Sequence, residues 1–281
     1  MVGIGTAAPV LPGPARAHPA GRVGHGVAMV GKALLPFVVL VGLWQASALA
    51  LGLSNYLYPR PALVLRTFGV LVQHGVLLSY TETSMWRWFV GVAAGAGLAV
   101  PVALVLTFYR PVARMMFPLI NFFTAIVELA WIPLFVLWFG YGFKVIVLSI
   151  AYVTFFPVLA NTMTGITQIP RTSIHAARTL GANRWQMALH VLLPGSLPGT
   201  VTGVRTGAGY GFRSLIGAEM IAAQSGLGYM IFESRANQLT QRTIAGMITI
   251  GVLWLVIDRL YLRSIEKATV QRWGMQRRAP R

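Results

Sequence analysis

Residues 143–165 read FKVIVLSIAYVTFFPVLANTMTG, and Lys144 is the only charged residue among them. A helix that crosses the hydrocarbon core of a bilayer needs about 20 mostly apolar residues, so this stretch predicts a transmembrane helix. Apolar runs of similar length lie on both sides of it, at Lys32–Leu53, Thr83–Phe108, Val112–Phe139, Thr200–Ala223 and Thr243–Leu262. The sequence therefore predicts an all-α, polytopic membrane bundle of about six spans.

The composition agrees with a lipid environment. Of the 281 residues, 56% are hydrophobic and 10% are charged, and the mean hydropathy is +0.67, so the chain has too little polar surface to cover a soluble globule. The net charge of +17 comes from cations between apolar runs and not from a basic groove, so no nucleic-acid partner is expected. The chain has no cysteine and five scattered histidines, so we expect no metal site and no cofactor.

Lysine and arginine remain preferentially in cytoplasmic loops, and their distribution predicts an orientation. With both termini inside, one side holds a larger set of cations: Arg110, Arg114, Arg171, Arg178, Arg184, Arg263, Lys267, Arg272, Arg277, Arg278 and Arg281. The other side holds Arg60, Arg66, Arg87, Lys144, Arg235 and Arg242. We expect residues 1–31 to be a disordered cytoplasmic leader, residues 32–82 to be the first span with an external interfacial segment, and residues 267–281 to be a basic cytoplasmic tail.

The segment Thr167–Gly199 is too long for a simple connection between two helices. Within it, Ile174, Ala177 and Gly181 fall at i, i+3 and i+7, so a helix after Pro170 would present one stripe with small members, which another backbone can approach closely. We expect Thr172 or Ser173 to cap the start of this helix and Gly181 or Asn183 to end it. Pro194 and Pro198 are expected to break any helix before the fifth span.

The same segment carries a spaced motif. It reads His175, Ala176, Ala177, three residues, Gly181, nine residues, and then Val191, Leu192, Leu193 and Pro194. This resembles the coupling loop of ATP-binding cassette (ABC) importer permeases: Glu-Ala-Ala, three residues, Gly, nine residues, Ile, any residue, Leu-Pro. The surrounding sequence resembles the nitrate, sulfonate and taurine branch of that family over roughly Thr83–Glu266. His175 stands where the family usually has glutamate, so an ion pair made by that glutamate does not carry over.

The resemblance implies a function and a set of partners. It implies a permease domain at 83–266 with a coupling loop at 167–199, two cytoplasmic ATPase subunits, an extracytoplasmic substrate-binding protein and a second permease subunit, expected to be an identical copy. The residues implied in coupling are Ile174, His175, Ala176, Ala177, Gly181, Leu193 and Pro194. The implied location is the bacterial inner membrane, in contact with lipid, and the implied cargo is a small anion, such as a sulfonate, taurine, nitrate or an aromatic carboxylate.

A second motif resembles a nucleotide-binding loop but does not predict nucleotide binding. Gly26, Gly31 and Lys32 have the spacing of a phosphate-binding loop, but Ala33 stands where serine or threonine should hold magnesium, and a membrane span begins at once. ATP is therefore expected to be bound, with its magnesium, by another polypeptide, and the chain itself is expected not to be an enzyme.

Charged residues inside the predicted spans are candidates for the translocation path. Arg205 and Arg213 lie eight residues apart in the fifth span, roughly 12 Å along a helix, and Glu219 follows in the same span, while Glu128 lies in the third. Each charge should face the bundle interior or a wet cavity. Arg213 either attracts a passing anion or pairs with Glu128 or Glu219, and Arg205 is expected to anchor the cytoplasmic end. Gly203, Gly207 and Gly211 predict close helix packing.

Three other classes of protein remain as alternatives. An ATP-independent secondary transporter or channel would work without a companion ATPase. A membrane enzyme would need paired carboxylates, a histidine cluster or an activated nucleophile, and none is evident. A structural scaffold would transport nothing.

Overall fold

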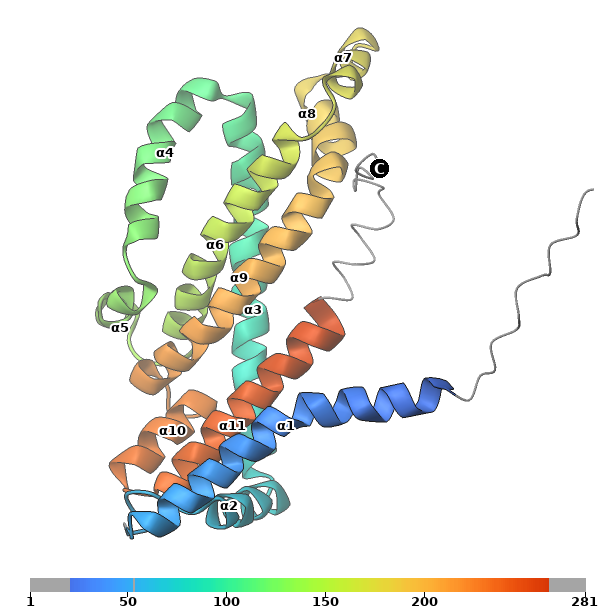
Figure 1. Cartoon of the computed structure of the whole chain (residues 1–281). Helices are drawn as coiled ribbons and strands as arrows, with labels where there is room; N and C mark the ends of the chain where they lie inside the picture. The colour runs from blue at the N-terminus through green and yellow to red at the C-terminus, as the bar shows by residue number, and fades with distance from the viewer. Residues whose placement is uncertain (1–20, 53, 263–281) are drawn as a thin grey trace, which may run out of the picture. The chain divides into compact units, whose positions relative to one another are not determined.

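A computed structural model describes residues 21–52 and 54–262, with side chains for 35–52 and 54–259. Within these ranges the regular secondary structure is entirely helical (Figure 1). The elements in chain order are α1 (Gly21–Ala50), α2 (Pro61–Gln73), α3 (Val76–Phe108), α4 (Arg110–Ala125), the 3-10 helix η1 (Glu128–Trp131), α5 (Ile132–Phe139), α6 (Phe143–Thr167), α7 (Arg171–Thr179), α8 (Arg184–Met187), the π-helix η2 (Ala188–Leu192), α9 (Leu193–Ala222), α10 (Leu227–Ala236), α11 (Thr240–Val256) and the π-helix η3 (Ile257–Leu262).

The chain divides into two units, residues 1–53 and 54–281. The first unit is described by α1, a helix of 30 residues that begins at Gly21 and contains Pro36. This helix includes residues 21–31 of the expected leader; the proline-rich part of the sequence ends at Pro19, and the next proline is Pro36. The remainder of the expected leader, 1–20, and the expected basic tail, 267–281, lie outside the described residues.

Four helical segments of the described chain are long and apolar enough to cross a membrane: Val76–Phe108, Phe143–Thr167, Arg184–Ala222 and Thr240–Arg259. A fifth is formed if the bent pair Arg110–Ala125 and Glu128–Phe139 counts as one span. The sixth expected span, Lys32–Leu53, falls on α1, where the side chains are described only from Leu35 onward. The described apolar part of this helix is Leu35–Ala50. The five positions that match confirm a polytopic helical membrane protein.

The third expected span, Val112–Phe139, is not one straight helix. Ile126 and Val127 have extended backbone angles, with ψ of 122° and 132°, and the two halves are bent by 90° at this break. Pro133, which has no backbone N–H, then lies in the first turn of α5, where none is needed. The bend puts the short η1 helix, with Glu128, beside α6 and α9.

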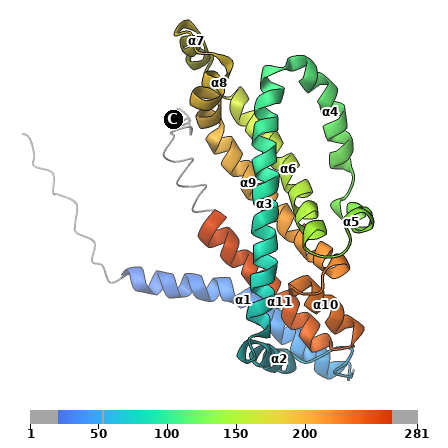
Figure 2. The same cartoon turned by 180° about the vertical axis from the view of Figure 1, so that it is seen from behind.

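The core of the second unit is formed where α3, α6 and α9 pack along one another (Figures 1 and 2). Gly203 and Gly207 of α9 are buried against α6. A Cβ at Gly203 would lie 3.0 Å from the carbonyl oxygen of Pro157, and one at Gly207 would lie 2.9 Å from that of Thr154. The glycines therefore permit a close backbone crossing, as the sequence predicts, and do not line a lumen.

The two ends of this unit carry different elements. α7 and α8 lie at one end, and α2 and α10 lie at the other (Figures 1 and 2). α2 is too short to be a span, as expected for an interfacial helix, and packs on α11 and α3 through buried residues that include Val64 and Leu71. The loop at 167–199 and the turn around Gly226 are therefore at opposite ends of the bundle.

Candidate coupling loop and translocation path

The loop that carries the spaced motif folds as a short helix, α7, directly after Pro170. Pro170 is its N-cap and no side chain caps it, so the expected cap by Thr172 or Ser173 is not formed. Ile174 and Ala177 are partly buried and pack on an apolar cluster of Ile166, Ile169, Met187 and Leu192. Two members of the stripe that was expected to dock a partner, Ile174 and Ala177, therefore pack against the rest of this chain.

Gly181 ends α7. Its φ is +78°, and its N–H donates to the carbonyl of Arg178 at 3.0 Å while Ala182 N–H donates to that of Ala177, also at 3.0 Å. This is the Schellman arrangement, in which a residue with positive φ follows the last helical turn. No atom lies within 4 Å of a Cβ placed at Gly181. Its role within the chain is conformational, and the expectation that Gly181 ends the helix is confirmed.

The chain turns back into the bundle through a second capped segment. Asn183 accepts a hydrogen bond from Gln186 N–H at 2.8 Å, and Gln186 Oε1 accepts one from Asn183 N–H at 2.9 Å, which is a capping box. The expectation that Pro194 and Pro198 interrupt the helix before the fifth span is wrong. Both prolines lie inside the continuous helical segment Arg184–Ala222. The π-helix η2 directly before Pro194 changes the backbone bonding there, and Pro198 is accommodated inside α9.

The free surface of this loop is the side opposite the cluster. His175 and Ala176 are exposed, and Leu180 and Trp185 have exposed fractions of 87% and 78%. Of the motif residues at the end of the loop, Leu193 is half-buried at the start of α9. Exposed large apolar side chains at the end of a helical hairpin are typical of a surface that a partner covers.

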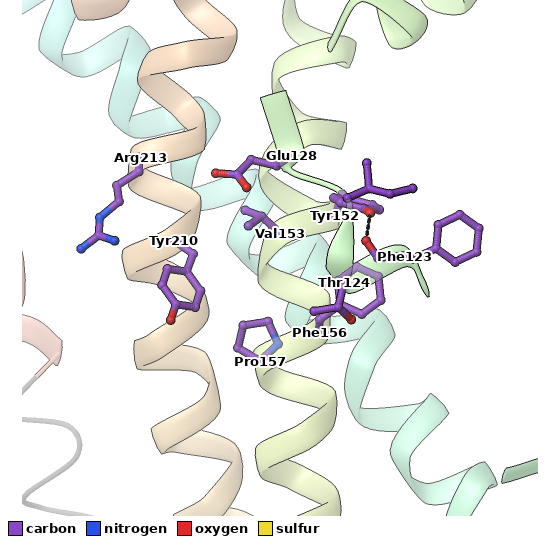
Figure 3. A pocket seen from close by; sticks show the side chains of 10 residues that line it. Phe123, Thr124, Glu128, Tyr152, Val153, Phe156, Pro157, Tyr210 and Arg213 are labelled. Carbon is purple, nitrogen blue, oxygen red and sulfur yellow. Dashed lines mark hydrogen bonds between the residues drawn. The ribbon is translucent and has the colours of Figure 1, made fainter. Parts of the chain in front are cut away.

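Arg213 lies on the exposed side of α9 and stacks over Tyr210, with Cζ 5.9 Å from the ring centroid. Both residues line a cavity of about 320 Å³ that is also bordered by Glu128 of η1 and by Tyr152 and Phe156 of α6. Figure 3 shows Glu128 directed toward α9 and the Arg213 guanidinium beside the Tyr210 ring. Within the described residues Arg213 forms no ion pair, so its predicted pairing with Glu128 or Glu219 is not observed.

Arg205 has a carboxylate partner on another helix. Its Nη2 lies 3.0 Å from Oδ1 of Asp258, in η3 at the end of α11. The pair borders a second cavity of about 300 Å³, which Arg213 and Tyr210 also line. Arg205 therefore joins α9 to η3 through an ion pair between two helices.

Glu219 is fully buried and does not border either of these cavities. Its carboxylate accepts hydrogen bonds from Arg87 Nη1 at 2.8 Å, from Ser84 Oγ at 2.9 Å and from Gly228 N–H at 2.9 Å. Arg87 also donates to the carbonyl oxygen of Ser225 at 2.6 Å. Glu219 is thus the partner of Arg87 and not of Arg213, and the network ties α3 and α9 to the turn before α10.

Sequence reasoning missed Ser84 and Asp258, and it counted Arg87 only among the cations on one side of the membrane. Arg87 falls inside a predicted span, and a cation there signals an acidic partner. With only six acidic residues in the chain, Glu219 could have been paired with it in principle. Arg87 and Glu219 are 132 residues apart in the sequence, and no local sequence pattern connects two positions at that distance.

Comparisons with known proteins agree with this architecture. Residues 91–268 match the family model described as binding-protein-dependent transport system inner membrane component. A putative ABC transporter permease protein of Methanocaldococcus jannaschii is 34% identical, over 85% of this chain and 90% of that protein. The putative aliphatic sulfonates transport permease protein SsuC of Bacillus subtilis is 31% identical, over 84% and 85%, and the taurine transport system permease protein TauC of Escherichia coli is 30% identical, over 82% and 85%.

Solved structures show the same fold. A chain of the MetNI methionine ABC transporter in an inward-facing conformation aligns with a TM-score of 0.57 at 19% identity, over 69% of this chain and 96% of that chain. An amino acid ABC transporter crystallised with histidines aligns with a TM-score of 0.56 at 17% identity, over 73% and 97%.

These matches identify a multi-pass, non-catalytic subunit that works with an ATPase, which binds the ATP, and with a substrate-binding protein. The chain belongs to the family of binding-protein-dependent transport system inner membrane components and is the permease subunit of an ABC importer.

Proposed function

We propose that two copies of this permease form a path for a small organic anion of the sulfonate class, and that α7 receives the motion of the ATPase. The observation that carries the proposal is Arg213, an exposed cation within the membrane-spanning part of α9 that has no ion-pair partner among the described residues. A guanidinium in this position costs about 2.5–3.5 kcal/mol if it faces lipid. It is therefore expected to face water, solute or a second subunit.

The surroundings of Arg213 support a polar path. Thr202, Thr206, Tyr210 and Arg213 follow one another at intervals of three or four residues, so they share one face of α9. The first two and Arg205 border the cavity of about 300 Å³, and Tyr210 and Arg213 border both cavities. Such a stripe does not suit contact with acyl chains. A path between two copies of α9 would place two Arg213 side chains around a passing anion.

The proposed substrate class is supported by the chemistry of Arg213 and by the names of similar permeases. A guanidinium binds the oxygens of sulfonates and carboxylates through directed hydrogen bonds. Of the three relatives described above, one is named as an ABC transporter permease, one as an aliphatic sulfonates permease and one as a taurine permease. Glu128 on the opposite wall of the cavity would repel a simple anion and attract an amino group, so it is a second candidate for substrate contact.

For coupling, we propose that the exposed side of α7 and the following turn contact the ATPase. This surface includes His175, Ala176 and Leu180, while Ile174 and Ala177 hold the helix on the bundle. Gly181, Leu193 and Pro194 act indirectly, through the geometry of the turn and of the start of α9. A rigid connection from α7 through α8 into α9 would carry the displacement to Arg213.

We propose the bacterial inner membrane as the location, with both termini and the α7 end in the cytoplasm. The arginines at this end support that orientation because cations accumulate in cytoplasmic loops. The permease domain is then 83–266 with its coupling loop at 167–199, and residues 32–82 add a first span and an external interfacial segment.

The test is ATP-driven uptake in proteoliposomes that contain the permease, the ATPase and the binding protein. Arg213→Gln should reduce uptake at least tenfold while basal ATP hydrolysis and the amount of assembled complex stay within about twofold, because the coupling loop is untouched. Arg213→Lys retains the charge and should retain part of the uptake, and Arg114→Gln, on the exposed surface of α4, serves as the control. Normal uptake by Arg213→Gln would refute the proposed role.

A further inference from the structure

A groove of about 410 Å³ lies between α3 and the segment that runs from α8 into α9. One wall is formed by Val100, Leu104, Val105 and Phe108 of α3, and the other includes Leu189 and Leu193. Val105 and Leu189 keep exposed fractions of 49% and 55%. This wall belongs to the last turns of α3, a helix that is long and apolar enough to cross a membrane.

The end of the groove toward α7 is polar and positive. Arg184 and Tyr109 border it there. The guanidinium of Arg184 donates a hydrogen bond to Tyr109 Oη at 3.3 Å and lies 5.5 Å from the centroid of the same ring. The sequence contains no aspartate or glutamate between 83 and 127 or between 129 and 218, and Arg184 forms no ion pair with any residue that the structure describes. An anion from outside the chain is the complementary partner.

The length of the groove matches one leaflet of a bilayer. From Tyr109 to Val100 the α3 helix rises by about 14 Å at 1.5 Å per residue, and half of a hydrocarbon core is about 15 Å. Trp185 borders the same end and is 78% exposed, as is common for tryptophan at the level of lipid headgroups. The groove thus has a charged mouth at the interface and an apolar channel of acyl-chain length.

We propose that this groove binds one anionic phospholipid of the cytoplasmic leaflet, with an acyl chain between α3 and η2 and the phosphate on Arg184. Arg184 begins α8, which follows the turn at Gly181, so the lipid contacts the element that links the coupling helix to α9. The lipid fills the space into which α8 would otherwise shift. It holds this link against α3 and stiffens the connection between α7 and the membrane-spanning part of α9.

The test is native mass spectrometry of the purified permease–ATPase complex with phosphatidylglycerol or phosphatidylcholine of identical acyl chains. The wild type should retain phosphatidylglycerol in preference to phosphatidylcholine. Arg184→Gln should weaken retention of phosphatidylglycerol about fivefold, the typical effect of one cation near an anionic headgroup, and should remove the preference. Arg114→Gln changes an exposed arginine that does not border the groove and should leave both unchanged.

Filling the groove tests the acyl-chain site separately. Val105→Trp places an indole in the channel and should lower retention of both lipids. Leu98→Trp is the matched control, because Leu98 is 62% exposed on the same helix and does not border the groove. Leu189→Trp fills the channel from the other wall, so a folding defect of one variant does not decide the result.

Two results would overturn the proposal. The first is equal retention of the two lipids by the wild type, or equal retention by the Val105→Trp and Leu98→Trp variants. The second is retention of phosphatidylglycerol by the isolated permease but not by the complex, which would show that a protein subunit covers the groove.

Discussion

Replacing Arg87 by methionine removes a buried cation from the network around Glu219 and keeps a side chain of similar length. The exposed fractions of the two side chains are 9% and 0%. The change removes the 2.8 Å ion pair with Glu219 and the two hydrogen bonds to Ser225, and it leaves Glu219 with its bonds from Ser84 and Gly228 only. A carboxylate stranded in this way destabilises a protein by about 3–5 kcal/mol.

The double variant Arg87→Met with Glu219→Gln separates the charge from the packing. Glutamine still offers one oxygen to Gly228 N–H and to Ser84, but it carries no charge, so the double variant should recover most of the stability that the single variant loses. Equilibrium unfolding in mixed micelles gives the free energies for the wild type, both single variants and the double variant. Their combination yields the coupling energy between the two side chains.

We expect a coupling energy of at least about 1.5 kcal/mol, since a buried pair bonded through charged groups contributes more than an ordinary hydrogen bond. The turn before α10 should also loosen in the single variant, because Ser225 loses both of its bonds to Arg87. Hydrogen exchange of residues 224–230 reports this loosening. A cost below about 1 kcal/mol for Arg87→Met, or no gain from the second change, would refute the assignment of this pair as the support of α10.

Further predictions concern the two turns and the division of labour. At Gly181, Asn should preserve ATP-coupled uptake better than Ala, because asparagine tolerates positive φ; the reverse order would show that close approach of a partner matters more than backbone conformation. Gly226→Ala should lower the yield of folded protein, since Gly226 has φ of +109° and an added Cβ would overlap the carboxylate of Glu219, whereas Gly69→Ala in α2, with open space around it, should have little effect. The purified permease alone should hydrolyse no ATP, because Gly26–Lys32 lies within the continuous helix α1 and forms no loop; magnesium-dependent hydrolysis by a contaminant-free sample would contradict this.

The fold was predictable where it depends on local pattern. The apolar runs that are long enough to span a membrane predict the positions of α3, α6, α9 and α11. The spacing of the glycines in α9 correctly indicates that this helix packs closely on α6. The break between α4 and α5 was not predictable from hydropathy. Residues 125–132 are as apolar as their neighbours, and only the positions of Glu128 and Pro133 hint at the 90° bend.

The candidate site was predictable in part. The start of α7 after Pro170 and its end at Gly181 were predictable, but the cap at its start and the face that it turns toward the protein were not. Ile174 and Ala177 face the protein itself, because the cluster they complete comes from α6, η2 and α8, which the local sequence does not connect. Likewise Arg213 and Glu219, six residues apart in one helix, have different surroundings that are set by α3 and η1.

The most direct test of the coupling mechanism is a cross-linking measurement in the assembled transporter. The chain contains no cysteine, so single cysteines can be placed at Leu180, which is 87% exposed beside α7, and at Leu189, which borders the lipid groove. Across a short thiol-to-amine linker, Leu180→Cys should join the permease to the ATPase in a yield that changes between the ATP-bound and ATP-free states, and Leu189→Cys should give no such product. A product from Leu189→Cys but not from Leu180→Cys would contradict the account, because the ATPase would then contact the side of the loop that we assign to lipid.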